Sequence, residues 1–79
     1  MASRPIPLSE LPVGSRAVVV SVEGPPALAA RLAALGFRPR TVLRCRRRAP
    51  LGDPRIYELR GTQLCLRRGE AAKIQVAPE

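Results

Sequence analysis

The sequence predicts an all-β fold, a small barrel of about five short strands with one short helix. Several segments alternate apolar and polar residues with the period of two that is typical of a half-buried strand. Glycine and proline interrupt these segments at short intervals. With 79 residues the chain is expected to form one domain. Closure of the sheet into a barrel would remove the exposed strand edges that so small a fold would otherwise leave.

The first strand is expected at residues 16–23, because Val18, Val20 and Val22 fall on one face at period two. Two prolines at residues 25–26 follow this segment. They should end the strand, because a proline has no amide hydrogen to donate to a neighbouring strand.

One short helix is expected at residues 27–35, directly after Pro26, which suits the first helical position. Its apolar stripe consists of leucines that recur at i, i+4 and i+7: Leu28, Leu32 and Leu35. Gly36 is expected to end the helix in a left-handed conformation. Phe37 is expected to fold back onto the stripe. A helix this short is not stable alone, so it should pack against the sheet.

The second strand is expected at residues 41–48, where apolar and basic side chains alternate. Leu43 and Cys45 would face inward. The outer face would carry alternate arginines: Arg44, Arg46 and Arg48. A turn is predicted after this strand at Gly52-Asp53, where the prolines on either side stiffen the chain.

Further strands are expected at residues 56–60, 63–68 and 73–76, with a turn at Gly61-Thr62 and one helical turn at residues 70–72. The residues that would face the core are apolar or aromatic: Tyr57, Leu59, Leu64, Leu66, Ile74 and Val76. This number of short strands around one helix favours an SH3-like barrel. An OB-fold is the second choice, since it usually needs more residues and longer loops.

We expect a single SH3-like domain at residues 8–77. Residues 1–7 hold two prolines and little that could pack, so they are expected to form a flexible N-terminus. They also lack the apolar segment of a signal peptide, and apolar runs elsewhere, such as residues 17–20, fall far short of the roughly twenty residues of a membrane span. A cytoplasmic location is therefore expected.

The net charge of +8 favours an acidic partner, which would be nucleic acid, an anionic membrane surface or an acidic face of a protein. Phe37 and Tyr57 are the only aromatic residues, so the chain lacks a platform on which bases could stack. Tight binding of nucleic acid is therefore not expected. A solvated strand face would explain the arginines equally well.

The sequence offers no constellation typical of an enzyme. It contains no histidine, and Asp53 and Glu58 are not placed as an acid–base pair. Cys45 and Cys65 lack an activating base and are too few for a closed zinc site. We interpret them as structural thiols, although a disulfide would be feasible if their strands pair side by side. No catalytic residue, metal ligand or cofactor is expected.

Several segments occur in the order and spacing seen in one known family: residues 8–14, 22–24, 31–39, 49–54, 61 and 64–71. On these segments the chain resembles the FeoA family of ferrous iron transport proteins, from Leu8 to Val76. The resemblance implies an SH3-like cytoplasmic protein that assists the GTP-driven transporter FeoB by protein–protein contact. It supplies no iron ligands. Arg40 departs from the pattern, because many members carry glycine at this position.

The resemblance and the residues together predict a non-enzymatic accessory or regulatory protein of ferrous iron uptake. It would dock on the cytoplasmic side of a FeoB-type transporter and be peripheral to the membrane through that partner. The expected partner-binding residues lie around the helix exit and the following turn: Leu35, Phe37, Arg38, Arg40, Arg46, Arg47, Arg48 and Asp53. A basic nucleic-acid-binding barrel and a membrane-surface protein are the alternatives. Homo-oligomer formation and adventitious binding of a transition metal ion stay open.

Overall fold

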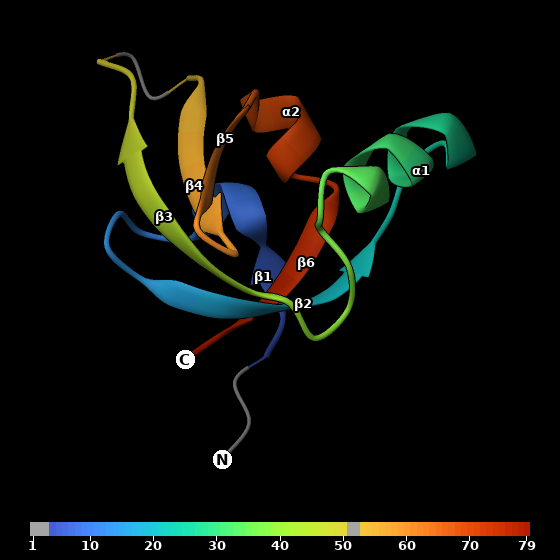
Figure 1. The fold of residues 1–79 in the computed structure, drawn as a ribbon, viewed down its shortest axis with the longest axis horizontal. Coiled ribbons are helices and arrows are strands. Elements are labelled where there is room, and N and C mark those ends of the chain that lie inside the picture. Colours follow the sequence, from blue (N-terminus) through green and yellow to red (C-terminus); the bar gives the residue numbers. More distant parts are fainter. Residues whose placement is uncertain (1–3, 51–52) are drawn as a thin grey trace.

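The computed structural model describes residues 4–50 and 53–79. Within these residues, six strands form one curled sheet in the order β1-β6-β2-β3-β4-β5, and every pairing is antiparallel (Figure 1). The strands are β1 (Ile6–Pro7), β2 (Arg16–Val22), β3 (Val42–Arg48), β4 (Arg55–Leu59), β5 (Thr62–Leu66) and β6 (Ile74–Pro78). The helices are the 3-10 turn η1 (Leu8–Glu10), α1 (Pro26–Ala34) and α2 (Arg68–Ala71). The predicted all-β fold is confirmed.

The sheet has one strand more than predicted, because Ile6 and Pro7 pair with Val76 and Gln75 of β6. A two-residue strand that contains a proline has no alternating pattern, and proline is tolerated there because β1 is an edge strand. The sheet therefore includes the last two residues of the segment that we expected to be flexible, whereas residues 1–3 lie outside the described part.

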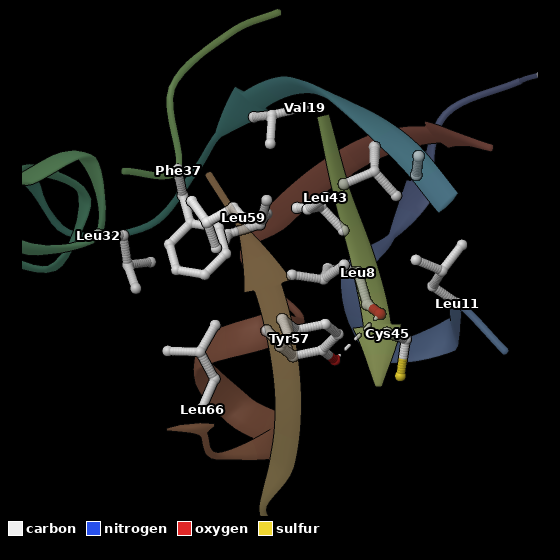
Figure 2. Close-up of a cluster of buried hydrophobic side chains, with 14 residues drawn as sticks. Leu8, Leu11, Val19, Leu32, Phe37, Leu43, Cys45, Tyr57, Leu59 and Leu66 are labelled. Carbon is white, nitrogen blue, oxygen red and sulfur yellow. Dashed lines mark hydrogen bonds between the residues drawn. The ribbon is translucent and has the colours of Figure 1, made fainter. Parts of the chain in front are cut away.

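The hydrophobic core lies inside the curl of the sheet (Figure 2). Its members come from nearly every element: Leu8, Leu11, Ala17, Val19, Leu32, Phe37, Leu43, Cys45, Tyr57, Leu59, Leu66, Ala71, Ile74 and Val76. The Tyr57 hydroxyl donates a hydrogen bond to the Leu8 carbonyl at 3.3 Å, which satisfies the polar end of a fully buried ring. Every inward-facing residue predicted for β3, β4, β5 and β6 is buried or packs against this core.

A β-bulge in β2 changes which valines share a face. Val19 pairs with Val76 and Val22 with Ile74, with a register shift between Val19 and Ser21. Val19 and Val22 therefore both lie on the core side, while Val20 is 43 % exposed. The expectation that Val18, Val20 and Val22 share one face is wrong, because the extra residue of a bulge interrupts the period of two.

A second bulge, in β3, lies between Cys45 and Arg47. Beyond this bulge, Arg48 pairs with Arg55. Arg55 lies two residues before the buried Tyr57 in β4, so Arg55 and Tyr57 are on the same face of the sheet. Arg48 therefore points toward the same side as Cys45. The expectation that it lines the outer face with Arg44 and Arg46 is wrong for the same reason.

Helix α1 starts at Pro26 and is followed by Gly36 with φ of 116°, so both expected boundary signals are confirmed. Phe37 is fully buried and donates its amide to the Leu32 carbonyl, as the predicted fold-back requires. Within the stripe, Leu32 is buried, whereas Leu35 lies just past the helix and is 41 % exposed.

The turn between β4 and β5 consists of Arg60 and Gly61, with φ of 52° and 76°, because Leu59 pairs with Thr62. The predicted turn at Gly61-Thr62 is thus displaced by one residue. Cys45 and Cys65 are free thiols on the two strands that flank β4, and they do not pair with each other.

Candidate functional site

The predicted partner-binding residues form two clusters at opposite ends of β3. The first, which we name the helix-exit segment, spans residues 35–40 and leads into β3. The second, the arginine end, comprises Arg46–Arg48 and Asp53 around the far end of the strand. Seven residues of β3, with a rise of about 3.3 Å each, separate the two clusters by up to about 20 Å. Figure 1 shows β3 running between them. The structure therefore presents two separate surfaces.

Backbone hydrogen bonds hold the helix-exit segment against β2. The Arg40 amide donates to the Val19 carbonyl at 2.8 Å, and the Val19 amide donates to the Thr41 carbonyl at 2.9 Å. The Arg38 Nε donates to the Ala33 carbonyl at the end of α1 at 3.1 Å. Arg40 has φ of 74°, so this arginine adopts the left-handed conformation that glycine most easily adopts.

The helix-exit segment joins basic and apolar side chains on the surface. Leu35, Arg38 and Arg40 are exposed. Two further apolar side chains are more than two-fifths exposed: Val20, which follows the residue bonded to Arg40, and Val42, which begins β3 directly after the segment. Such a mixture can provide an apolar contact with a charged rim.

Phe37 does not contribute to this surface. Its side chain is 0 % exposed and lies in the core between Leu32 and Leu59 (Figure 2). The expectation that it contacts a partner is corrected, because no part of the ring is accessible. Phe37 instead anchors the segment that presents its neighbours.

The residues of the arginine end differ in their partners. Arg46 Nε lies 3.6 Å from Glu58 Oε1, so its charge is balanced across the strand pair. Arg47 pairs with Ile56 on the outer face, and Arg48 pairs with Arg55 on the core side. All three arginines of residues 46–48 are exposed.

Asp53 contributes to the position of α2. Its Oδ1 accepts a hydrogen bond from the Arg68 amide at 2.8 Å, at the first turn of α2. A carboxylate there satisfies an amide that has no partner within the helix and interacts favourably with the helix dipole. The Asp53 side chain thus already has a hydrogen-bond partner within the protein.

Arg55 is a residue that the sequence reasoning missed. It is 6 % exposed, and its Nε and Nη1 atoms are buried without a hydrogen-bond partner. Arginine is almost never fully buried unless it is paired, so a sequence gives little reason to place one inside. A signal was available, since Arg55, Tyr57 and Leu59 alternate at period two and all three are buried.

The buried polar groups near Arg55 are held neutral. Burial raises the pKa of the Cys45 thiol, against a smaller opposing effect of the positive charges of Arg48 and Arg55. Burial, with a further contribution from Cys45, raises the pKa of Tyr57 to about 12. A protonated thiol is a poor nucleophile. The described residues contain no group of three or more Cys, Asp or Glu side chains that could hold a metal ion. They also form no helix with the length and hydropathy of a membrane span.

Comparison with known protein families identifies the family to which this domain belongs. The model of the FeoA domain matches residues 6–78. The chain belongs to the FeoA family. This membership confirms the resemblance of its sequence segments, and the FeoA domain is linked to ferrous iron transport.

One relative of this FeoA-family chain is a Fe(2+) transport protein A/Fe(2+) transporter FeoB fusion protein of Porphyromonas gingivalis. The two are 43 % identical over 72 residues, which cover 87 % of this chain and 8 % of the fusion protein. The chain therefore spans less than a tenth of that relative.

Solved FeoA structures share the fold. The solution structure of FeoA from Chlorobium tepidum is 44 % identical, with a TM-score of 0.85 over 92 % of this chain and 70 % of that one. The crystal structure of Stenotrophomonas maltophilia FeoA complexed with zinc is 35 % identical, with a TM-score of 0.77 over 96 % of this chain and 88 % of that one. The latter is described as a procaryotic SH3 domain protein, so the predicted SH3-like fold is confirmed.

Proposed function

We propose that this FeoA-family chain is a non-enzymatic accessory protein that docks on the cytoplasmic side of a FeoB-type ferrous iron transporter. The observation that carries the proposal is the fusion relative, in which an FeoA domain and an FeoB transporter share one chain. Covalent linkage keeps two modules at a high effective concentration, which favours modules that contact each other.

The helix-exit segment is the surface that fits such docking best. Leu35 of this segment, with the exposed Val20 of β2 and Val42 of β3, can pack against a partner, and Arg38 and Arg40 can orient an acidic rim. A docked chain changes the state of a transporter only by contacting one state better than another. The role is therefore regulatory, with iron as the cargo of the transporter.

The test is binding of the purified chain to the detergent-solubilised transporter. The double variant Arg38→Glu/Arg40→Glu should weaken binding at least about tenfold, since opposite charges at a contact become like charges. The double variant Arg4→Glu/Arg60→Glu is the matched control, because it changes the net charge equally at exposed positions outside the segment. Equal loss in both variants would show that net charge alone determines binding.

The nucleic-acid alternative rests on the net charge of +8. It predicts that binding falls steeply with salt, since each phosphate contact releases counterions. A contact with an apolar centre should depend less on salt. Nuclease treatment of the transporter preparation and a salt series therefore separate the two functions within the same experiment.

A further inference from the structure

Two arginines lie directly opposite each other at the end of the β3–β4 pair. Arg48 pairs with Arg55, and both lie on the core side of the sheet near the Tyr57 and Cys45 side chains. Like charges directly opposite each other on neighbouring strands destabilise a sheet. A negative charge between them would reverse the sign of this interaction.

Among the described residues, no acidic side chain forms an ion pair with Arg48 or Arg55. Glu58, Glu70 and Glu79 form ion pairs with other arginines, namely Arg46, Arg31 and Arg16. Asp53 accepts a hydrogen bond from the Arg68 amide. The remaining acids, Glu10 and Glu23, form no ion pair among the described residues.

Burial of Arg55, the inner arginine of the pair, is energetically unfavourable. Arg55 is more than nine-tenths buried, and its Nε and Nη1 have no hydrogen-bond partner. A guanidinium cannot lose its proton in a protein, so burial leaves a charged group with two nitrogen atoms unpaired, although the Arg55 side chain also interacts with the Tyr57 hydroxyl. An apolar side chain of similar volume would usually stabilise such a position. Packing alone therefore does not explain an arginine here.

We infer that Arg48 and Arg55 form an oxyanion-binding site, with a phosphate or a carboxylate group as the ligand. The planar fork of a guanidinium matches both groups, and such charge-assisted hydrogen bonds are strong. Arg48 is exposed and meets the ligand first, while the buried Arg55 contributes its positive charge from the inner side. This inference does not depend on the proposed docking to a transporter.

Nuclear magnetic resonance of the arginine Nε–Hε groups tests the site directly in the full chain. Titration with inorganic phosphate, and separately with sodium acetate, should shift the Arg48 and Arg55 signals along saturable curves. Sodium chloride at matched ionic strength should not shift these two signals. Saturation by phosphate alone assigns the site to phosphate groups, and equal saturation by acetate assigns it to carboxylates. Shifts that grow linearly for all arginines alike would overturn the inference.

Variants of neighbouring arginines provide matched controls. Arg48→Ala should weaken anion binding about tenfold or more, the usual effect of losing a hydrogen bond to a charged group. Arg46→Ala removes the same charge two residues away, but Arg46 is already paired with Glu58, so the affinity should change less than about twofold. Equal effects of the two variants would refute a specific site.

The inner arginine is tested with Arg55→Met, which keeps an unbranched side chain and removes the charge. This variant should lose the saturable response and should melt at a higher temperature than the wild type in phosphate-free buffer. Unchanged anion binding by Arg55→Met would overturn the inference. If Arg55→Met does not fold, the comparison of Arg48→Ala with Arg46→Ala decides the question by itself.

Discussion

The Arg40 amide donates a hydrogen bond to the Val19 carbonyl at 2.8 Å while Arg40 itself holds φ of 74°. This contact joins the helix-exit segment to β2 and requires a backbone conformation that disfavours any residue with a Cβ atom. It explains why glycine suits this position, as the resemblance to the family implies. The loop keeps a conformation suited to glycine although the residue is arginine.

Arg40→Gly should therefore stabilise the protein. Relief of the left-handed conformation contributes about 1–2 kcal/mol, and the greater freedom of glycine in the unfolded chain offsets about half of it. A net gain of about 0.5–1 kcal/mol in the free energy of unfolding is expected, measured by urea denaturation. Arg40→Ala is the control, because it removes the same charge but keeps the Cβ atom. An equal gain in both variants would assign the effect to charge.

Gly36→Ala should be strongly destabilising. Gly36 has φ of 116°, and a Cβ atom there would lie 2.8 Å from Leu59 Cδ1 in the core. We expect a loss of at least about 2 kcal/mol, from backbone strain and overpacking together, seen as a lower thermal midpoint. Gly69→Ala provides the comparison, because nothing lies within 4 Å of the added atom and Gly69 lies inside α2. A neutral or slightly positive effect is expected at this position.

Arg60→Asn should stabilise the β4–β5 hairpin. Arg60 and Gly61 both have positive φ between paired residues, the arrangement of a two-residue type I′ turn that favours Asn-Gly. The gain should be about 0.5 kcal/mol in denaturant unfolding, since asparagine tolerates the left-handed region better than arginine. Arg60→Ala should show no such gain. Stabilisation by alanine would mean that the arginine charge, and not the turn conformation, is unfavourable.

Stability should fall in alkaline solution. Burial raises the pKa of Cys45 above its usual 9.0 and that of Tyr57 from 10.0 to about 12. Above these usual values the unfolded chain releases protons that the folded chain retains, so the unfolded state is favoured as the pH rises. The stability that Tyr57 contributes is complete below pH 10 and is lost between about pH 10 and 12, at up to about 1.4 kcal/mol for each pH unit.

Tyr57→Phe isolates this contribution. The variant loses the hydrogen bond to the Leu8 carbonyl and about 1 kcal/mol of stability at neutral pH. Its free energy of unfolding should then decline less steeply above pH 10 than that of the wild type. Parallel alkaline profiles of Tyr57→Phe and the wild type would contradict the assignment.

Most elements of the fold could be predicted because their signals are local. Alternating side chains define the strands, and Pro26 and Gly36 mark the ends of α1 within one or two residues. The features that were not predicted all depend on pairing between segments that are distant in the sequence. The strand at Ile6–Pro7 exists because β6 offers it partners, and neither bulge has a signature in its own sequence.

The candidate surfaces were predicted less well than the fold. The sequence predicted partner-binding residues around the helix exit and beside the following turn, and the structure places these two groups at opposite ends of β3. Phe37 was expected both to pack onto the helix and to meet a partner, and full burial allows only the first. Arg55 was missed because arginine is usually exposed. Its alternation with Tyr57, which indicates a position facing the core, is a weaker signal than the residue type.

The bulge in β3 has a consequence for chain length. Cys45 pairs with Tyr57 and Arg47 pairs with Ile56, so Arg46 is the extra residue of the bulge and has no paired residue on β4. A chain that lacked this one residue would keep every remaining pair in register and would still direct Arg48 inward. It would lose one outward positive charge and the local bend that a bulge gives a strand. Among family members, a single-residue deletion at this point is thus a milder change than an insertion at any regularly paired position of β3, which would reverse the faces of the residues beyond it.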